Sequence, residues 1–303
     1  MRSLEVSLAP SKPGAPITIE ICSCVHVGHN MHEREKTIEY FDRVLKAEDT
    51  YLVNLGDSGD NGTKQSPGGS VYENYLNPME QAVVVATLFR PLVQRGKVLW
   101  WHDSNHSFRT FKESGAFTLE ETVARLFFGD GVADSVWKLM RRYAEGAFDA
   151  RPATKRAKLG YIAEAIEAVE PYLKKKPAVQ WAGWQALTRV VAGKQAYTFH
   201  SMHGEGSCVA ATSALAAVIK QRDIGLADLY VRGHHHKRTA SDALRAEWSS
   251  GRPVYRRVGF LTTGCYLGYD NSYGEMKGYT PVATGMSRVV LATGPDRWFK
   301  LEV

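Results

Sequence analysis

The chain has 303 residues, 44% of them hydrophobic, and contains no low-complexity tract. A chain of this length and composition can bury a large core, which excludes disordered and fibrous proteins. Its first residues, MRSLEVSLAPSKPGAP, lack a signal-type apolar run, and no segment approaches the roughly 18 uninterrupted apolar residues typical of a membrane span. We therefore expect a cytoplasmic protein with no membrane partner.

The cysteines and the charges indicate reduced thiols and one basic segment. Four irregularly spaced cysteines are too few for a disulfide framework, and a bridge between Cys22 and Cys24 would be strained. The net charge is +6, and residues 138–176 alone carry ten Lys/Arg against five Asp/Glu. Such a surface attracts polyanions, including nucleic acid, although a solvated helical face has the same composition.

The first half of the chain alternates predicted strands and helices. Three apolar runs are typical of buried strands: 17–24, 51–55 and 97–101. Residues 33–47 place four apolar residues on one helical stripe: Ile38, Phe41, Val44 and Leu45. Asn77 and Glu80 match an N-cap pattern that opens a helix through about Arg90. This alternation predicts an α/β fold with helices packed on a sheet.

A helical pattern then occupies Phe117 to about Pro177, and we expect a helical cap, with bounds 117–186, inserted within one domain of residues 1–303. Strand character resumes near Leu187. Later elements are a hairpin turn at 192–194, a helix at about 208–221, a strand at 229–233 and a closing hairpin around 294–296.

All ten histidines fall into four clusters, at 26/29/32, 102/106, 200/203 and 234/235/236. Structural histidines are expected to scatter along a chain, so clusters that follow predicted strands indicate a site. Residues i and i+2 of a strand point to the same face, so Cys24 and His26 can hold one ion together. Asp57 follows the next strand and has two carboxylate oxygens, which can bridge two cations.

Three further segments also follow strands, and they contribute Asn105 with His106, His203, and His234 with His236. The last segment, Gly-His-His-His, is the most specific, because its first and third histidines project the same way after an apolar strand. Open α/β sheets have their sites at the carboxyl ends of the strands. We therefore expect all five segments to meet at one edge of a sheet.

These segments resemble the calcineurin-like metallophosphoesterase superfamily, whose pattern is D-x-H, G-D-x-x-D, G-N-H-D/E, H-G and G-H-x-H. More narrowly, stretches such as GDSGDNGTKQSPGGSVYENYLNPMEQ and CYLGYDNSYGEMKGY resemble an uncharacterised bacterial and phage branch often labelled phosphoesterase or exonuclease-like. The resemblance to the superfamily pattern covers about residues 17–240 except the insertion. It implies a four-layer α/β/β/α sandwich of two mixed sheets, the metallo-dependent phosphatase fold.

The resemblance also implies a centre of two divalent metal ions. The first ion would take Cys24, His26, Asp57 and His236, and the second would take Asp57, Asn105, His203 and His234. His106 would lie beside the leaving group, with Asp60 as an orienting acid. His200 is an alternative to His203, but only His203 has the following glycine. We expect substrate contacts from His29, Asn61 and Arg109.

Two positions depart from the family pattern. Cys24 replaces the usual aspartate, and a soft sulfur favours zinc or iron over magnesium, so manganese, zinc and iron are the candidate metals. Ser104 and Ser107 flank Asn105-His106 where glycine and an acid are usual. His106 therefore lacks its customary orienting carboxylate in the sequence pattern.

From this pattern we expect a hydrolase that cleaves phosphodiester bonds with a two-metal-activated hydroxide. DNA or RNA is the favoured substrate, because the basic segment and its aromatic residues, Trp137, Tyr143, Phe148 and Tyr161, suit backbone tracking and base stacking. One alternative is a phosphomonoesterase or small-nucleotide phosphodiesterase. Another is a degenerate, non-catalytic metal-binding module. The sequence leaves the oligomeric state open.

Overall fold

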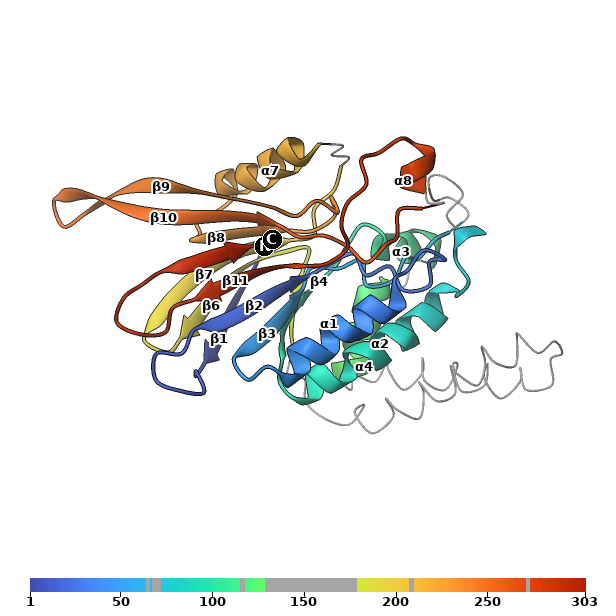
Figure 1. Ribbon diagram of the computed structural model, residues 1–303, viewed down its shortest axis with the longest axis horizontal. Helices are drawn as coiled ribbons and strands as arrows, with labels where there is room; N and C mark the ends of the chain where they lie inside the picture. The colour runs from blue at the N-terminus through green and yellow to red at the C-terminus, as the bar shows by residue number, and fades with distance from the viewer. Residues whose placement is uncertain (64–65, 67–71, 115–117, 129–178, 207–209, 271–272) are drawn as a thin grey trace.

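The computed structural model describes residues 1–63, 66, 72–114, 118–128, 179–206, 210–270 and 273–303 (Figure 1). Their strands form two mixed sheets of six strands each. In spatial order, sheet A contains β1 (Arg2–Leu8), β6 (Gln185–Ala192), β7 (Gln195–Met202), β8 (Leu229–Arg232), β10 (Arg252–Thr262) and β9 (Thr239–Ser249). Sheet B contains β12 (Phe299–Glu302), β11 (Ser287–Leu291), β2 (Ile17–Cys22), β3 (Thr50–Asn54), β4 (Val98–His102) and β5 (Gln180–Gly183).

The strand directions bring several carboxyl ends together. In sheet B, the four strands β2, β3, β4 and β5 are parallel, whereas β11 and β12 are antiparallel additions. In sheet A, β7, β8 and β10 are parallel, and β9 forms a long hairpin with β10. Because parallel strands end on the same side, each sheet presents a row of strand-end loops at one edge.

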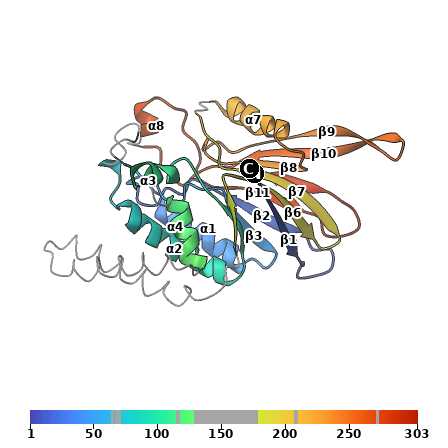
Figure 2. The same cartoon turned by 180° about the vertical axis from the view of Figure 1, so that it is seen from behind.

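Helices cover the outer faces of both sheets. Sheet B carries α1 (Arg34–Lys46), α2 (Pro78–Gln94) and α4 (Leu119–Phe128), and sheet A carries α7 (Ala211–Ile219), which runs into the 3₁₀ turn η3 (Lys220–Asp223). Two shorter helices, α3 (Ser107–Ser114) and α8 (Tyr273–Met276), follow loops. Figures 1 and 2 show α7 on one side of the paired sheets and the other long helices on the opposite side. The predicted α/β class with two mixed sheets is confirmed.

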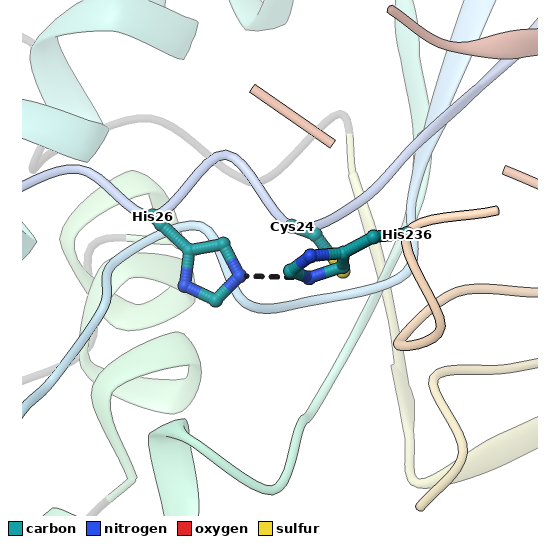
Figure 3. Close-up of side chains that lie close together, drawn as sticks. All are labelled: Cys24, His26 and His236. Carbon is teal, nitrogen blue, oxygen red and sulfur yellow. Dashed lines mark hydrogen bonds between the residues drawn. The ribbon is translucent and has the colours of Figure 1, made fainter. Parts of the chain in front are cut away.

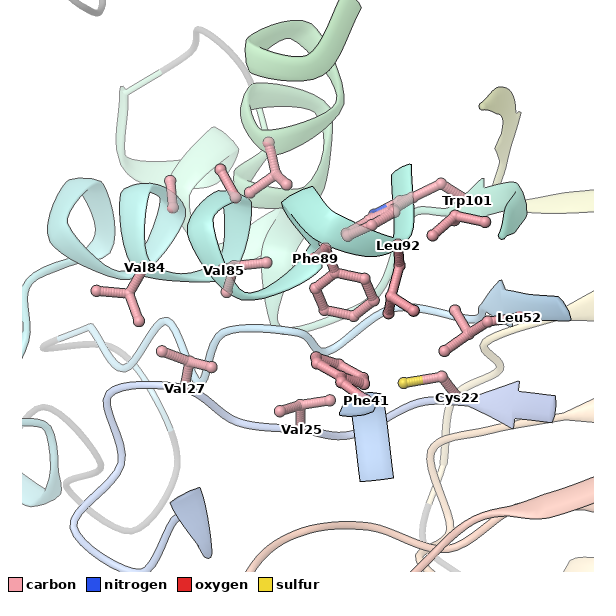
Figure 4. Packing of buried hydrophobic residues seen from close by; sticks show 14 of the residues in the cluster. Cys22, Val25, Val27, Phe41, Leu52, Val84, Val85, Phe89, Leu92 and Trp101 are labelled. Carbon is pink, nitrogen blue, oxygen red and sulfur yellow. The ribbon is translucent and has the colours of Figure 1, made fainter. Parts of the chain in front are cut away.

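The buried residues explain this layering. One cluster lies between the two sheets and includes Ile19 and Leu229. A second fills the space between sheet B and its helices, where Phe89 of α2 packs against Phe41 and Trp101 with ring centroids 4.5 and 4.6 Å away (Figure 4). Aromatic pairs at this distance add to the stability that apolar burial supplies. The core therefore holds the strand ends of sheet B in fixed positions.

Sequence patterns predicted several elements correctly, but they misplaced one residue on the buried face of α1. The Asn77 side chain accepts a hydrogen bond from the Glu80 N–H at 3.0 Å, and the Glu80 carboxylate accepts one from the Asn77 N–H at 2.8 Å. This capping box confirms the predicted start of α2. In α1, however, Ile38 is 43% exposed and Tyr40 is buried. Phe41 and Val44 are buried and Leu45 packs against the core as predicted, so the stripe prediction was wrong only at Ile38, because the helix instead turns Tyr40 toward the ring of Tyr266.

The predicted insertion needs correction at its described ends. Residues 129–178, with the basic segment and its aromatic residues, lie outside the described residues. At one end, α4 buries Leu119 and Val123 in the same core cluster as α2, so it belongs to the main fold. At the other end, residues 180–183 form β5 and Gln185 begins β6, where helix was expected. Within the described part, no helix is long and apolar enough to cross a membrane.

Candidate metal centre

The five strand-end segments meet at the rim of the sandwich, but they come from two sheets. The segments around Cys24, Asp57 and His106 follow β2, β3 and β4 of sheet B. The segments around His203 and His234 follow β7 and β8 of sheet A. The expectation of one sheet edge is therefore corrected, since the site lies where the edges of two packed sheets face each other.

The first ligand group consists of Cys24, His26 and His236, whose donor atoms lie within 4.8 Å of one another (Figure 3). His26 Nε2 is 3.2 Å from His236 Nε2, and His26 Nδ1 is 2.9 Å from Asp60 Oδ1. The Asp60 carboxylate accepts a hydrogen bond from the Nδ1–H of His26, which leaves the Nε2 lone pair of His26 directed at the other ligands. Burial lowers the pKa of His26 and His236, which favours the neutral imidazole that a metal requires.

The second group consists of Cys24, Asp57 and His203. His203 Nδ1 is 2.9 Å from the Leu55 carbonyl oxygen, to which it donates, so its Nε2 carries a lone pair. That Nε2 lies 3.0 Å from Asp57 Oδ2 and makes no hydrogen bond. Two electron-rich atoms at this distance repel each other unless a cation lies between them. Burial opposes ionisation of Asp57, but the nearby His106 outweighs it and holds the Asp57 pKa well below its usual range.

Backbone strain is concentrated at the residues that carry the predicted metal ligands. Seven described non-glycine residues have positive φ, and five of them are predicted metal ligands: Cys24, His26, Asp57, His234 and His236. A sixth is Asn61. Such left-handed residues cost about 1–3 kcal/mol each and concentrate at functional sites. The expectation that ligand pairs project from one face of a strand was therefore wrong, because β2 and β8 end before these residues.

Glycines allow the loops to approach one another. Gly56 has φ +98°, and a Cβ there would lie 2.6 Å from Ser104 Cβ. A Cβ at Gly233 would lie 2.2 Å from Ser23 Oγ. Any larger side chain at either position would push apart the loops that carry Asp57 and His234.

His106 lies beside the two groups, with an 18% exposed side chain, and is a member of a third group with His26 and Asp60. Its Nδ1 donates to the Asp60 carbonyl oxygen at 2.8 Å, and Arg109 Nη2 lies 3.0 Å from its Nε2. Burial opposes protonation of His106, but Asp57 and Asp60 outweigh it and raise the His106 pKa. His106 and Arg109 therefore face the same space next to the ligands.

The structure gives Asn61 a second role. Its amide Nδ2 donates to the His106 carbonyl oxygen at 2.6 Å and also to the Ser107 carbonyl oxygen at 3.3 Å. Asn61 is fully buried. It thus anchors the loop that carries His106, whereas its contact with a substrate stays a prediction.

Other predicted residues lie close to the centre but outside the three groups. Asn105 has a buried Oδ1 without a hydrogen-bond partner, which fits an amide oxygen kept for a cation. The His234 ring is 5.2 Å from that of His203, and its Nε2 is 2.6 Å from the Gly206 carbonyl oxygen. His29 Nε2 lies 3.4 Å from Glu73. His200 instead packs at 6.0 Å from the Tyr230 ring, so the structure favours His203 over it.

Sequence reasoning missed Glu120, a residue of α4 whose carboxylate binds the turn that follows Asp57. Its carboxylate accepts the Ser58 N–H at 2.7 Å, the Ser58 hydroxyl at 3.0 Å and Trp101 Nε1 at 2.6 Å. Burial raises the Glu120 pKa to about 8 despite these bonds. Within the segment TLEETVARLFF, no local signal separates Glu120 from an ordinary exposed acid.

Asp60 provides a direct test of this arrangement. Asn74 also donates to Asp60 Oδ2 at 2.7 Å, so the carboxylate is fixed on both oxygens. We expect Asp60→Asn to weaken metal binding by about 10–100-fold, because an amide cannot accept on both sides and the His26 ring loses the charged acceptor that sets its orientation and tautomer. Competition with a chromophoric chelator measures this, and the exposed Asp42→Asn is the control. Equal affinities for Asp60→Asn and Asp42→Asn would contradict the role assigned to Asp60.

The donor set of the centre suits transition metals. It combines imidazole nitrogens, a carboxylate and a sulfur, which zinc and iron accept readily. The three described cysteines, Cys22, Cys24 and Cys265, are free, so Cys24 is available as a ligand. Comparison of the chain with models of known protein families found no match, and comparison with curated protein sequences found none either.

Proposed function

We propose that this protein is a metallophosphoesterase of the calcineurin-like type, with the metallo-dependent phosphatase fold, that hydrolyses phosphodiester bonds. The observation that carries the proposal is the pair of buried ligand groups at the rim where the two sheets meet. Buried groups of this kind without a cation would be costly, because their lone pairs face each other. Two manganese, zinc or iron ions are the proposed cofactors.

Cations held by these ligand groups would polarise a phosphoryl oxygen and activate water as a nucleophile at neutral pH. The chain's own residues do the remaining work. His106 hydrogen-bonds to the oxygen that departs from phosphorus and gives it a proton. Arg109, 3.0 Å from His106, pairs its guanidinium with the phosphate oxygens. Asp60 orients the His26 ring, and Asn61 anchors the backbone of His106.

Nucleic acid is the substrate class we propose. The support is the excess of basic over acidic residues in 138–176, which would favour a polyanion over a small monoester.

A panel of substrates tests the function. The metal-loaded protein should cleave bis(p-nitrophenyl) phosphate faster than p-nitrophenyl phosphate, and it should degrade a DNA or RNA oligonucleotide. Binding of a non-cleavable oligonucleotide should weaken linearly with salt on a logarithmic scale. Cleavage of the monoester alone would favour the phosphomonoesterase alternative. Metal binding with no turnover on any substrate would favour a non-catalytic module.

A further inference from the structure

We propose that Cys24 is the ligand shared by the two metal ions, so that a thiolate bridges them. This inference rests on the proposed function, since it concerns the same metal centre. In the resemblance that the sequence suggests, Asp57 has the bridging role. The structure assigns the two residues differently.

Cys24 is the residue common to both ligand groups. Its Sγ lies within 4.8 Å of donor atoms of His26 and His236, and within the same distance of donor atoms of Asp57 and His203. Asp57 belongs to one of these groups only. Among the described residues, the sulfur is thus the donor atom that both groups share.

The backbone fixes Cys24 at the junction of the two sheets. Its N–H donates to the Gly56 carbonyl oxygen at 2.9 Å, which ties it to the loop after β3. Its carbonyl oxygen accepts the Tyr266 N–H at 3.1 Å, which ties it to the loop after β10. The φ of 53° turns the side chain away from the direction it would have on a continued strand. Contacts from both sheets therefore place the sulfur between the groups, and they offset the strain of this conformation.

Burial and the nearby Asp57 raise the Cys24 pKa, so the thiol would lose its proton on binding a cation, and two polar groups beside the sulfur oppose this rise. Ser23 Oγ lies 3.2 Å from Cys24 Sγ, and the backbone N–H of His234 also donates to the sulfur. Hydrogen bonds to a ligating sulfur hold it in position and reduce its charge density. Cys24 is fully buried, which protects the sulfur from oxidants in solution.

A sulfur shared by both ions would influence which metal occupies each position, whereas a terminal sulfur would influence only one position. With Cys24 as a terminal ligand, only one ion would prefer soft-ligand metals, and a mixed pair with a hard ion would be stable. With Cys24 as the bridge, both positions favour zinc, iron or cadmium over magnesium and manganese. Asp57 would then be a ligand only in the group that it forms with Cys24 and His203, whose Nε2 lies 3.0 Å from Asp57 Oδ2.

Cadmium NMR of the protein loaded with two equivalents of cadmium tests the bridge. We expect two resonances, both shifted strongly downfield by sulfur ligation, with a coupling between the two ions transmitted through the shared atom. In Cys24→Asp, both resonances should move to the nitrogen and oxygen range. Cys265→Ala is the matched control, because it removes a second buried thiol close to Cys24 and should leave both resonances in place.

The alternatives give different spectra. One sulfur-shifted and one unshifted resonance would overturn the bridge and leave a two-metal hydrolase intact. Loss of the sulfur shift in Cys265→Ala, with retention in Cys24→Asp, would overturn the assignment of the sulfur. Failure of the folded wild-type protein to bind a second cadmium ion would overturn both the bridge and the proposed two-metal function, and circular dichroism would establish that the fold is retained.

Discussion

Asp57→Asn should lower kcat/KM for phosphodiester hydrolysis by on the order of 10³-fold, because several kcal/mol of metal-dependent stabilisation are lost at 1.36 kcal/mol per tenfold. The carboxylate is 1% exposed and lies 3.0 Å from His203 Nε2 and 4.0 Å from His106 Nε2. An amide keeps the shape but removes the charge that holds the cations. Steady-state kinetics with bis(p-nitrophenyl) phosphate measure the effect.

The control for this substitution is Asp42→Asn, at an exposed acid paired with Lys46 on α1. An exposed pair of this kind contributes little to stability, so the control should keep its activity. Metal content should be measured for both variants. If Asp57→Asn kept full activity with a full complement of metal, the site assignment would be wrong.

His106→Asn should have the second-largest effect, and its size should depend on the leaving group. For a diester with an alkyl leaving group, such as an oligonucleotide, we expect a loss of about 10²–10⁴-fold, which is the usual contribution of a general acid. A nitrophenolate leaves without a proton, so the loss with bis(p-nitrophenyl) phosphate should be much smaller. The ratio of the two losses is the quantity to measure.

His32→Asn serves as the control for His106→Asn, because His32 Nε2 is paired with Thr37 at 3.1 Å in the loop before α1. It should affect both substrates equally and weakly. Equal large losses of His106→Asn on both substrates would instead assign His106 to metal binding or to loop structure, and would contradict a role at the leaving oxygen.

Local patterns predicted the strands that position the site. The apolar runs before Cys24, Asp57 and His234 became β2, β3 and β8, because buried strands need continuous apolar residues. The end of α2 was less well predicted, since Pro91 lies within the helix, which continues to Gln94. The strand β1 was missed, although Leu4, Val6 and Leu8 alternate with polar residues in the period of a half-buried strand, and its pairing partner β6 is far along the chain.

The geometry of the site depended on contacts that a sequence does not display. Left-handed conformations at Cys24 and His26 carry no glycine signal, and they persist because both N–H groups bond to the loop after β3, at Gly56 and Asp57. The support of that loop by Glu120 requires a helix contributed from much later in the chain. The residues that lie together were therefore easier to predict than their division into groups.

The most direct test of the central claim is metal analysis of the purified protein together with phosphodiester hydrolysis before and after chelation. We expect two transition-metal ions per chain, loss of hydrolysis when a chelator removes them, and recovery when zinc, iron or manganese is restored. Hydrolysis that continued unchanged in fully metal-free protein would contradict the two-metal account.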